Sequence, residues 1–183
     1  MLKYYLLILF FCTIITDSRA DIKNKIIQNL INTDTLDFKF EQNINGEIEN
    51  GNCSIKYPKK IYCEYYKSNN KILVSNGKAL VIKTRTSFYR YPLDKTPLNI
   101  ILDKNFLINK IKDLKERIID DDFIYYKIIG KNNEISIFFN NQTFDLIGWQ
   151  NTDIYQNFNI TYISSIRKNR ILPKNLFKLP IQN

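Results

Sequence analysis

The chain of 183 residues contains no histidine, and this absence excludes several kinds of active site. Without an imidazole there is no Ser-His-Asp triad, no Cys-His dyad and no His-ligated zinc. The Gly-x-Ser-x-Gly turn of lipid hydrolases and the glycine-rich loops of nucleotide-binding proteins are also missing from the sequence. We therefore expect a protein that is not an enzyme and that uses neither a metal ion nor a cofactor.

Glycine is scarce, with five residues, whereas tyrosine and phenylalanine number twelve each, and this balance favours strands over a helical bundle. A hydrophobic content of 44% excludes a disordered chain, and the length suits one domain. The net charge of +9 comes from 21 lysines and only 6 arginines, and the lysines are scattered along the chain. Because a nucleic-acid site needs clustered basic residues, we expect no nucleic-acid partner.

No apolar run is long enough to cross a bilayer comfortably. The longest, residues 4–15, follows a short basic start and has about a dozen residues. Ser18 and Ala20 then occupy the small-residue positions of a cleavage site. This pattern predicts a secretory signal peptide, residues 1–20, cleaved after Ala20, and a single exported domain, residues 21–183. The alternative is an uncleaved membrane anchor.

Two of the three cysteines, Cys53 and Cys63, follow the predicted signal peptide. They lie symmetrically about a turn at Pro58 and have the same parity along two strand-like runs. An antiparallel hairpin would place them opposite each other and within reach of a disulfide, which an exported protein can retain. The alternative is a pair of apolar thiols that face each other in the core, and the sequence leaves both open.

The period of the apolar residues predicts an α+β domain built on one antiparallel sheet. Apolar residues at helical spacing predict a helix over residues 21–32, and the helical period returns over residues 97–119. The expected strands cover residues 36–41, 47–56, 61–67, 72–75, 79–83, 87–91, 123–129, 134–139, 143–149 and 156–163. Both helical segments are strongly apolar. They would either pack directly on the sheet or stand apart from it and enclose a cavity, and the pattern alone does not decide between these arrangements.

Several loose motifs occur in an order and spacing that resemble one known family. They are LDFKFEQ from Leu36, GNCSIKYPKKIYCEY from Gly51, ILVSNGKAL from Ile72, Pro97-Leu98 with Ile101-Leu102, Ile135 to Phe139, LIGW from Leu146, Asp153, Phe177 and Pro180. Together they resemble the LolA family, the periplasmic carriers of outer-membrane lipoproteins.

This resemblance implies a curled antiparallel sheet, or half-open β-barrel, covered by a helical lid that encloses an apolar cavity. It implies a monomer in the periplasm that binds the acyl chains of lipoproteins. An ABC transporter of the inner membrane would release these lipoproteins, and an outer-membrane acceptor would receive them. The alternative function is an exported module that binds another amphiphile or a glycolipid.

The family positions also imply which residues bind the ligand. The expected cavity and lid residues are Phe38, Phe40, Ile55, Tyr57, Ile61, Tyr65, Ile101, Leu102, Phe106, Phe139 and Trp149. Family members usually carry an arginine before the hairpin proline, where it hydrogen-bonds to the closed lid, but this chain has Tyr57 there. Because tyrosine offers one hydroxyl and no fixed charge, we expect Tyr57 at the cavity wall and a lid held mainly by apolar contacts.

Overall fold

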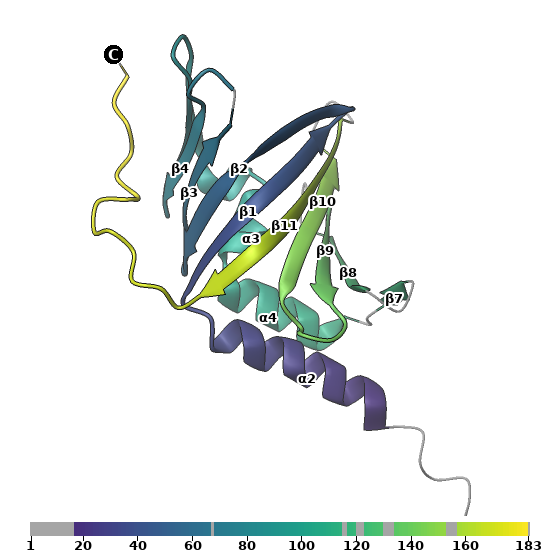
Figure 1. Ribbon diagram of the computed structural model, residues 1–183. Coiled ribbons are helices and arrows are strands. Elements are labelled where there is room, and N and C mark those ends of the chain that lie inside the picture. The colour runs from purple at the N-terminus through teal and green to yellow at the C-terminus, as the bar shows by residue number, and fades with distance from the viewer. Residues whose placement is uncertain are drawn as a thin grey trace, which may run out of the picture.

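The computed structural model describes residues 17–66, 68–114, 117–119, 123–129, 134–152 and 157–182. Its centre is a single sheet of eleven strands in the order β6-β5-β4-β3-β2-β1-β11-β10-β9-β8-β7 (Figure 1). All neighbouring strands are antiparallel. The sheet curls but does not close, because β6 and β7 are its two edges. The predicted α+β class with a half-open barrel is confirmed.

The elements follow one another along the chain in an order close to the predicted one. They are α2 (Asp17–Ile31), β1 (Thr35–Ile44), β2 (Glu47–Lys56), β3 (Lys60–Tyr65), β4 (Ile72–Asn76), β5 (Ala79–Lys83), β6 (Phe88–Pro92), the 3-10 helix η1 (Leu93–Lys95), α3 (Leu98–Leu102), α4 (Lys104–Asp113), β7 (Arg117–Ile119), β8 (Phe123–Ile129), β9 (Glu134–Asn140), β10 (Leu146–Thr152) and β11 (Phe158–Lys168).

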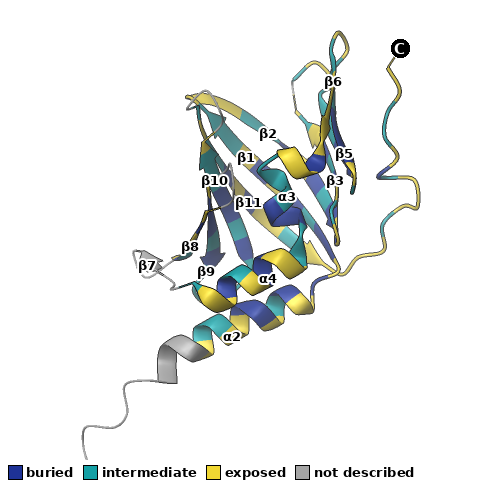
Figure 2. Cartoon of the chain, turned by 180° about the vertical axis from the view of Figure 1, so that it is seen from behind, coloured by how far each residue is buried: buried dark blue, intermediate teal, exposed yellow. Residues whose placement is uncertain are grey.

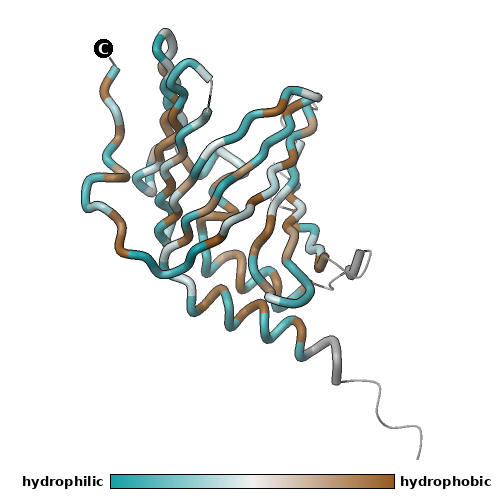
Figure 3. Tube along the Cα trace, viewed as in Figure 1, coloured by the Kyte–Doolittle hydropathy of each residue, from teal (hydrophilic) through white to brown (hydrophobic). Residues whose placement is uncertain are grey.

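Strand β1 lies in the middle of the sheet, between β2 and β11. Its pairing with β2 runs without a shift and ends at a turn made by Asn45 and Gly46, whose φ angles of 51° and 94° fit a two-residue hairpin loop. Hydrophobic and hydrophilic residues alternate along the central strands (Figure 3). The alternation gives the sheet an apolar concave face and a more polar convex face.

Helices α2, α3 and α4 of the described residues lie on the concave side of the sheet (Figure 2). Ile26, Ile27 and Leu30 of α2 are buried at helical spacing, and the same spacing recurs in the buried side chains of α4. Helices α2 and α4 also contact each other. Together they close one end of the curled sheet, whereas the short helix α3 lies over its middle (Figure 2).

The predicted helix over residues 97–119 is wrong in two places. Asp103 has a non-helical backbone and separates α3 from α4, and α4 ends at Asp113 because Leu114 is extended. Residues Arg117–Ile119 form β7, which pairs with β8, so the β-branched Ile118 and Ile119 follow their strand propensity.

The last two strands differ from the predicted ranges. Strand β10 begins at Leu146 and not at residue 143, because Asn140 accepts two backbone hydrogen bonds, from Gln142 and Thr143, in a turn. Strand β11 extends to Lys168 because it pairs with β1 over most of its length.

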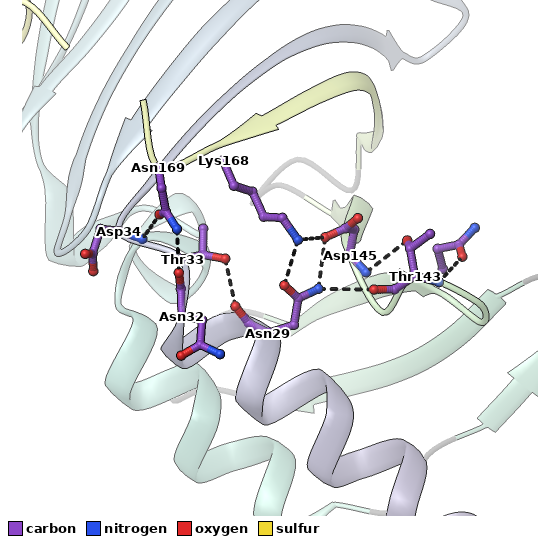
Figure 4. Close-up of polar contacts among 9 residues, drawn as sticks. Asn29, Asn32, Thr33, Asp34, Thr143, Asp145, Lys168 and Asn169 are labelled. Carbon is purple, nitrogen blue, oxygen red and sulfur yellow. Dashed lines mark hydrogen bonds and ion pairs between the residues drawn. The ribbon is translucent and has the colours of Figure 1, made fainter. Parts of the chain in front are cut away.

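A polar network joins the end of α2 to the sheet (Figure 4). The amide of Asn29 donates to the Asp145 carboxylate at 2.9 Å, and Lys168 donates to the same carboxylate at 2.7 Å and to the Asn29 side-chain oxygen at 2.9 Å. Burial alone would raise the pKa of Asp145. The hydrogen bonds from Lys168 and Asn29 and the charge of Lys168 outweigh burial, so the pKa lies below its ordinary value of 3.8.

Most of the predicted signal peptide, residues 1–16, lies outside the described residues. Helix α2 begins at Asp17, inside the predicted peptide, and cleavage after Ala20 stays a prediction. Within the described part of the chain, none of the helices has both the length and the apolar character needed to cross a membrane.

Candidate functional site

A cavity of about 180 Å³ lies between α3 and the concave face of the sheet. Six of the predicted residues line it: Phe38, Phe40, Ile61, Tyr65, Ile101 and Trp149. The structure adds lining residues that the sequence analysis missed, the apolar Leu73, Leu80, Leu98 and Ile135 and the polar Gln42, Thr96, Asn151, Asn159 and Thr161. Leu73 and Leu80 lie on predicted strands, where the period of two could have indicated their common face.

Two aromatic pairs form part of the inner surface of this cavity. The rings of Phe40 and Tyr65 meet edge to face with centroids 4.9 Å apart, above Gly51, which pairs with both residues across the sheet. A Cβ atom at Gly51 would lie 2.0 Å from the Glu64 carbonyl oxygen and 2.6 Å from the Phe40 ring. Glycine is therefore required here so that the two rings can close over the strand.

The second pair consists of Phe38 and Trp149, which also meet edge to face with centroids 6.4 Å apart. Both are buried, with 3% and 8% of their surface exposed. Strands β1 and β10 supply them from opposite sides of β11, so the curl of the sheet directs both rings toward the cavity.

Cys53 and Cys63 form a disulfide and line the cavity. They are direct cross-strand partners in the β2–β3 hairpin, with Cα atoms 4.1 Å apart. This separation is nearer to the roughly 4.5 Å of opposite residues that do not hydrogen-bond to each other than to the roughly 5.5 Å of those that do. Of the two arrangements that the sequence left open, the structure therefore contains the bonded one.

The end of the cavity farther from α2 is polar but uncharged. Gln42, Asn151, Asn159 and Thr161 lie there, and the Gln42 amide donates to the Asn159 side-chain oxygen at 2.9 Å. The Thr161 hydroxyl is buried and has no hydrogen-bond partner among the described residues. No acidic or basic side chain is among the described residues that line the cavity.

An ion pair lies beside this polar end. Lys71 bonds to Glu49 at 2.7 Å, and its ammonium group is 4.2 Å from the centre of the Tyr65 ring. Burial and, to a lesser extent, the Glu49 charge raise the pKa of Tyr65. Its hydroxyl therefore stays protonated at neutral pH and contacts the Gln42 side-chain oxygen at 3.4 Å.

Tyr57 does not line this cavity, and the prediction that places it at the cavity wall is wrong. It is buried beside α2 and the turn between β9 and β10, where it lines a cavity of only about 20 Å³ with Leu30 and Phe144. Strand β2 ends at the same end of the sheet as α2 and α4 (Figure 1), and Tyr57 is not among the residues that line the main cavity. Burial raises the pKa of the Tyr57 hydroxyl.

Phe106 also lies away from the cavity, with 36% of its surface exposed. The break at Asp103 changes the helical phase, so α4 buries Leu107, Ile108 and Ile111 and turns Phe106 outward. The remaining predicted residues are fully buried core residues that do not line the cavity: Ile55, Leu102 and Phe139.

The sequence of residues 31–180 matches the family model described as outer membrane lipoprotein carrier protein LolA. The chain belongs to the LolA family. The resemblance inferred from the motifs is thereby confirmed. No curated protein sequence matches the chain.

Several solved structures resemble the chain in fold, at low sequence identity. An uncharacterized conserved protein from Thermus thermophilus has a TM-score of 0.51 and 9% identity, over 88% of this chain and 94% of that chain. A LolA superfamily protein from Nitrosomonas europaea has a TM-score of 0.46 and 12% identity, over 90% of this chain and 99% of that chain. LprF from Mycobacterium bovis has a TM-score of 0.48 and 12% identity, over 88% of this chain and 98% of that chain.

In this member of the LolA family, the helix that covers the cavity, α3, is called the lid, and two lysines attach it and its junction with α4 to the rest of the domain. The backbone N–H of Lys59, in the β2–β3 turn, donates to the Leu102 carbonyl at 2.9 Å, and its ammonium group pairs with Asp103 at 3.0 Å. Lys104 donates to the Thr33 carbonyl at 2.9 Å, and its ammonium group lies 5.5 Å from the centre of the Tyr57 ring. Polar contacts at the α3–α4 junction thus supplement the apolar contacts of the lid.

Proposed function

We propose that this LolA-family protein is a periplasmic carrier of lipoproteins. It would receive them from an ABC transporter of the inner membrane and pass them to an acceptor at the outer membrane. The observation that carries the proposal is the uncharged, largely apolar cavity between a short helical lid and a curled sheet.

The physical need for such a cavity comes from the acyl chains. Burying one methylene group is worth about 0.8 kcal/mol, so a long acyl chain cannot cross an aqueous compartment unshielded. A carrier must also release its ligand, which favours a broad apolar surface with few strong polar anchors. The aromatic pairs of Phe40 with Tyr65 and of Phe38 with Trp149 provide such a surface.

The volume of about 180 Å³ is below the roughly 300–1,000 Å³ that is usual for small-molecule sites. This form therefore corresponds to a closed carrier, and acyl chains must displace α3. Ile101 and Leu102, which belong to α3 itself, are fully buried against the sheet, and exposing both to water would cost roughly 3–6 kcal/mol. When the lid opens, bound acyl chains can contact Ile101 and Leu102 in place of the sheet. These apolar contacts offset most of the cost, so the ligand itself favours opening.

The test is to purify the protein from its native envelope and identify bound lipid by mass spectrometry. We expect peptide carrying acyl groups. A free glycolipid would support the alternative, an exported module for another amphiphile, and protein purified without lipid that also failed to bind an apolar fluorescent probe would refute both.

A matched pair of variants ties binding to the cavity. Leu73→Trp adds bulk to a residue that lines the cavity, and we expect it to reduce recovered lipid severalfold. Ile48→Trp makes a similar change at a position with 60% exposure outside the cavity and should leave recovery unchanged. Equal recovery from both variants would place the lipid elsewhere on the protein.

A further inference from the structure

We propose that Gln42, Asn151, Asn159 and Thr161 form a polar subsite that binds the uncharged ester or amide group through which an acyl chain is attached. The inference rests on the proposed function, because it specifies which part of an acylated ligand the cavity recognises. It also makes a separate claim, that the site prefers acyl esters and amides to free fatty acids.

The sheet brings these four side chains together from strands that are distant in sequence. Gln42 of β1 pairs with Thr161 of β11, and Thr161 in turn pairs with Trp149 of β10. One step along the same face, Asn159 pairs with Asn151. Because residues two apart share a face, all four point to the concave side with Phe40 and line one end of the cavity.

Thr161 supplies the observation that indicates a ligand. Its side chain lines the cavity, only 3% of the residue is exposed, and its hydroxyl has no hydrogen-bond partner among the described residues. A buried hydroxyl without a partner is destabilising, and valine would fill the same space without that cost. A ligand carbonyl oxygen near Thr161 would accept the missing hydrogen bond.

The neighbouring amides complement an ester or an amide. Gln42 and Asn159 bond to each other at 2.9 Å, which uses one of the two Gln42 amide hydrogens and fixes the relative position of the two side chains. The remaining amide hydrogens can donate to a ligand carbonyl, and an amide oxygen can accept from a ligand N–H.

The absence of charge determines what the subsite disfavours. The described residues that line the cavity include no lysine or arginine, and the nearby Lys71 is neutralised by Glu49 at 2.7 Å. A carboxylate or phosphate drawn into the cavity would be buried without a counter-charge, which is strongly unfavourable. An ester or amide carries the same acyl chain with no charge to bury.

The experiment compares four ligands that share one chain: palmitate, methyl palmitate, N-methylpalmitamide and hexadecane. Each displaces a neutral fluorescent probe, N-phenyl-1-naphthylamine, from the full-length protein. We expect the ester and the amide to bind at least fivefold more tightly than palmitate and hexadecane. If palmitate bound as tightly as the ester, the subsite would be refuted while the carrier proposal stood. If none of the four displaced the probe, the carrier proposal would fail as well.

Three variants assign the preference to Thr161. Thr161→Val should weaken binding of the ester about fivefold, the size of one neutral hydrogen bond, and leave hexadecane binding unchanged. Thr161→Ser keeps the hydroxyl and should keep the preference. Thr152→Val makes the same chemical change at an exposed position outside the cavity and should change neither ligand. Hexadecane binding shows whether the Thr161→Val protein is folded. If that protein bound hexadecane normally and bound the ester as tightly as the original protein does, the proposal would be overturned.

Discussion

The junction between α3 and α4 gives a direct test of how the lid is held. Asp103 has two roles there: its carboxylate accepts from the Phe106 backbone N–H at 3.1 Å and so caps α4, and it pairs with Lys59 at 3.0 Å. Asp103→Asn removes the charge but retains a good capping residue, whereas Asp103→Ala removes both interactions. The two variants therefore separate the ion pair from the cap.

The expected effects follow from the geometry. The Lys59 and Asp103 side chains are 37% and 25% exposed, so their ion pair contributes only about 0.5 kcal/mol. Loss of the cap costs about 1 kcal/mol more. Opening of the lid should thus become roughly twofold more frequent in Asp103→Asn and roughly tenfold more frequent in Asp103→Ala.

Hydrogen exchange at the Lys59 amide measures this opening, because that N–H bonds to the Leu102 carbonyl at 2.9 Å. The amides of β9, in the body of the sheet, report on global unfolding and should exchange at unchanged rates. Asp94→Ala removes an exposed carboxylate from the 3-10 helix η1 and serves as the matched control. If the Lys59 amide exchanged at the original rate in a folded Asp103→Ala protein, the lid would not be held by this junction.

Three further predictions concern stability. Thr161→Val should raise the free energy of unfolding of the empty protein by about 1 kcal/mol, because it removes a buried hydroxyl without a partner; a loss of stability in denaturant titration would contradict this. Gly51→Ala should lower the melting temperature by many degrees or prevent folding, since its Cβ atom would lie 2.0 Å from the Glu64 carbonyl oxygen. An unchanged melting temperature would contradict this, because it would mean that β2 and β3 can move apart at Gly51 without cost. The pKa of Asp145 is lower in the folded protein than its ordinary value of 3.8. The Asp145 carboxylate therefore stabilises the fold fully at pH values above 3.8, and this stabilisation is lost as the pH falls through the folded pKa. Asp145→Asn should therefore be less stable at neutral pH and lose less stability on acidification, and parallel pH dependences would count against a role for its bond to Lys168.

Local patterns predicted most of the strands, and the reason is physical. Each strand has one buried face, so apolar and polar residues alternate along it, and the Asn45–Gly46 turn fixes the register of β1 with β2. The alternation of residues along two strands joined by the Pro58 turn likewise predicted that Cys53 and Cys63 would face each other.

The errors occur where distant segments decide the structure. The phase change that exposes Phe106 depends on a break at Asp103, where the carboxylate caps the next helix, and no glycine or proline marks that break. Tyr57 is buried against α2, and the spacing of residues does not reveal this contact. The polar end of the cavity depends on β1 pairing with β11, for which the sequence contains no local signal.

The pairing of β1 with β11 also affects when the domain can fold. Gln42 and Asn159, which bond across this pairing, are 117 residues apart, and the two strands are neighbours in the middle of the sheet. Until the ribosome has made β10 and β11, strand β1 lacks one of its two neighbours, and Phe38 on its concave face lacks its partner Trp149. A topology of this kind folds slowly, because a long loop must close before its contacts form. Slow closure delays completion of the fold until late in synthesis, which suits the periplasmic role that we propose, because an exported chain crosses the membrane before it folds.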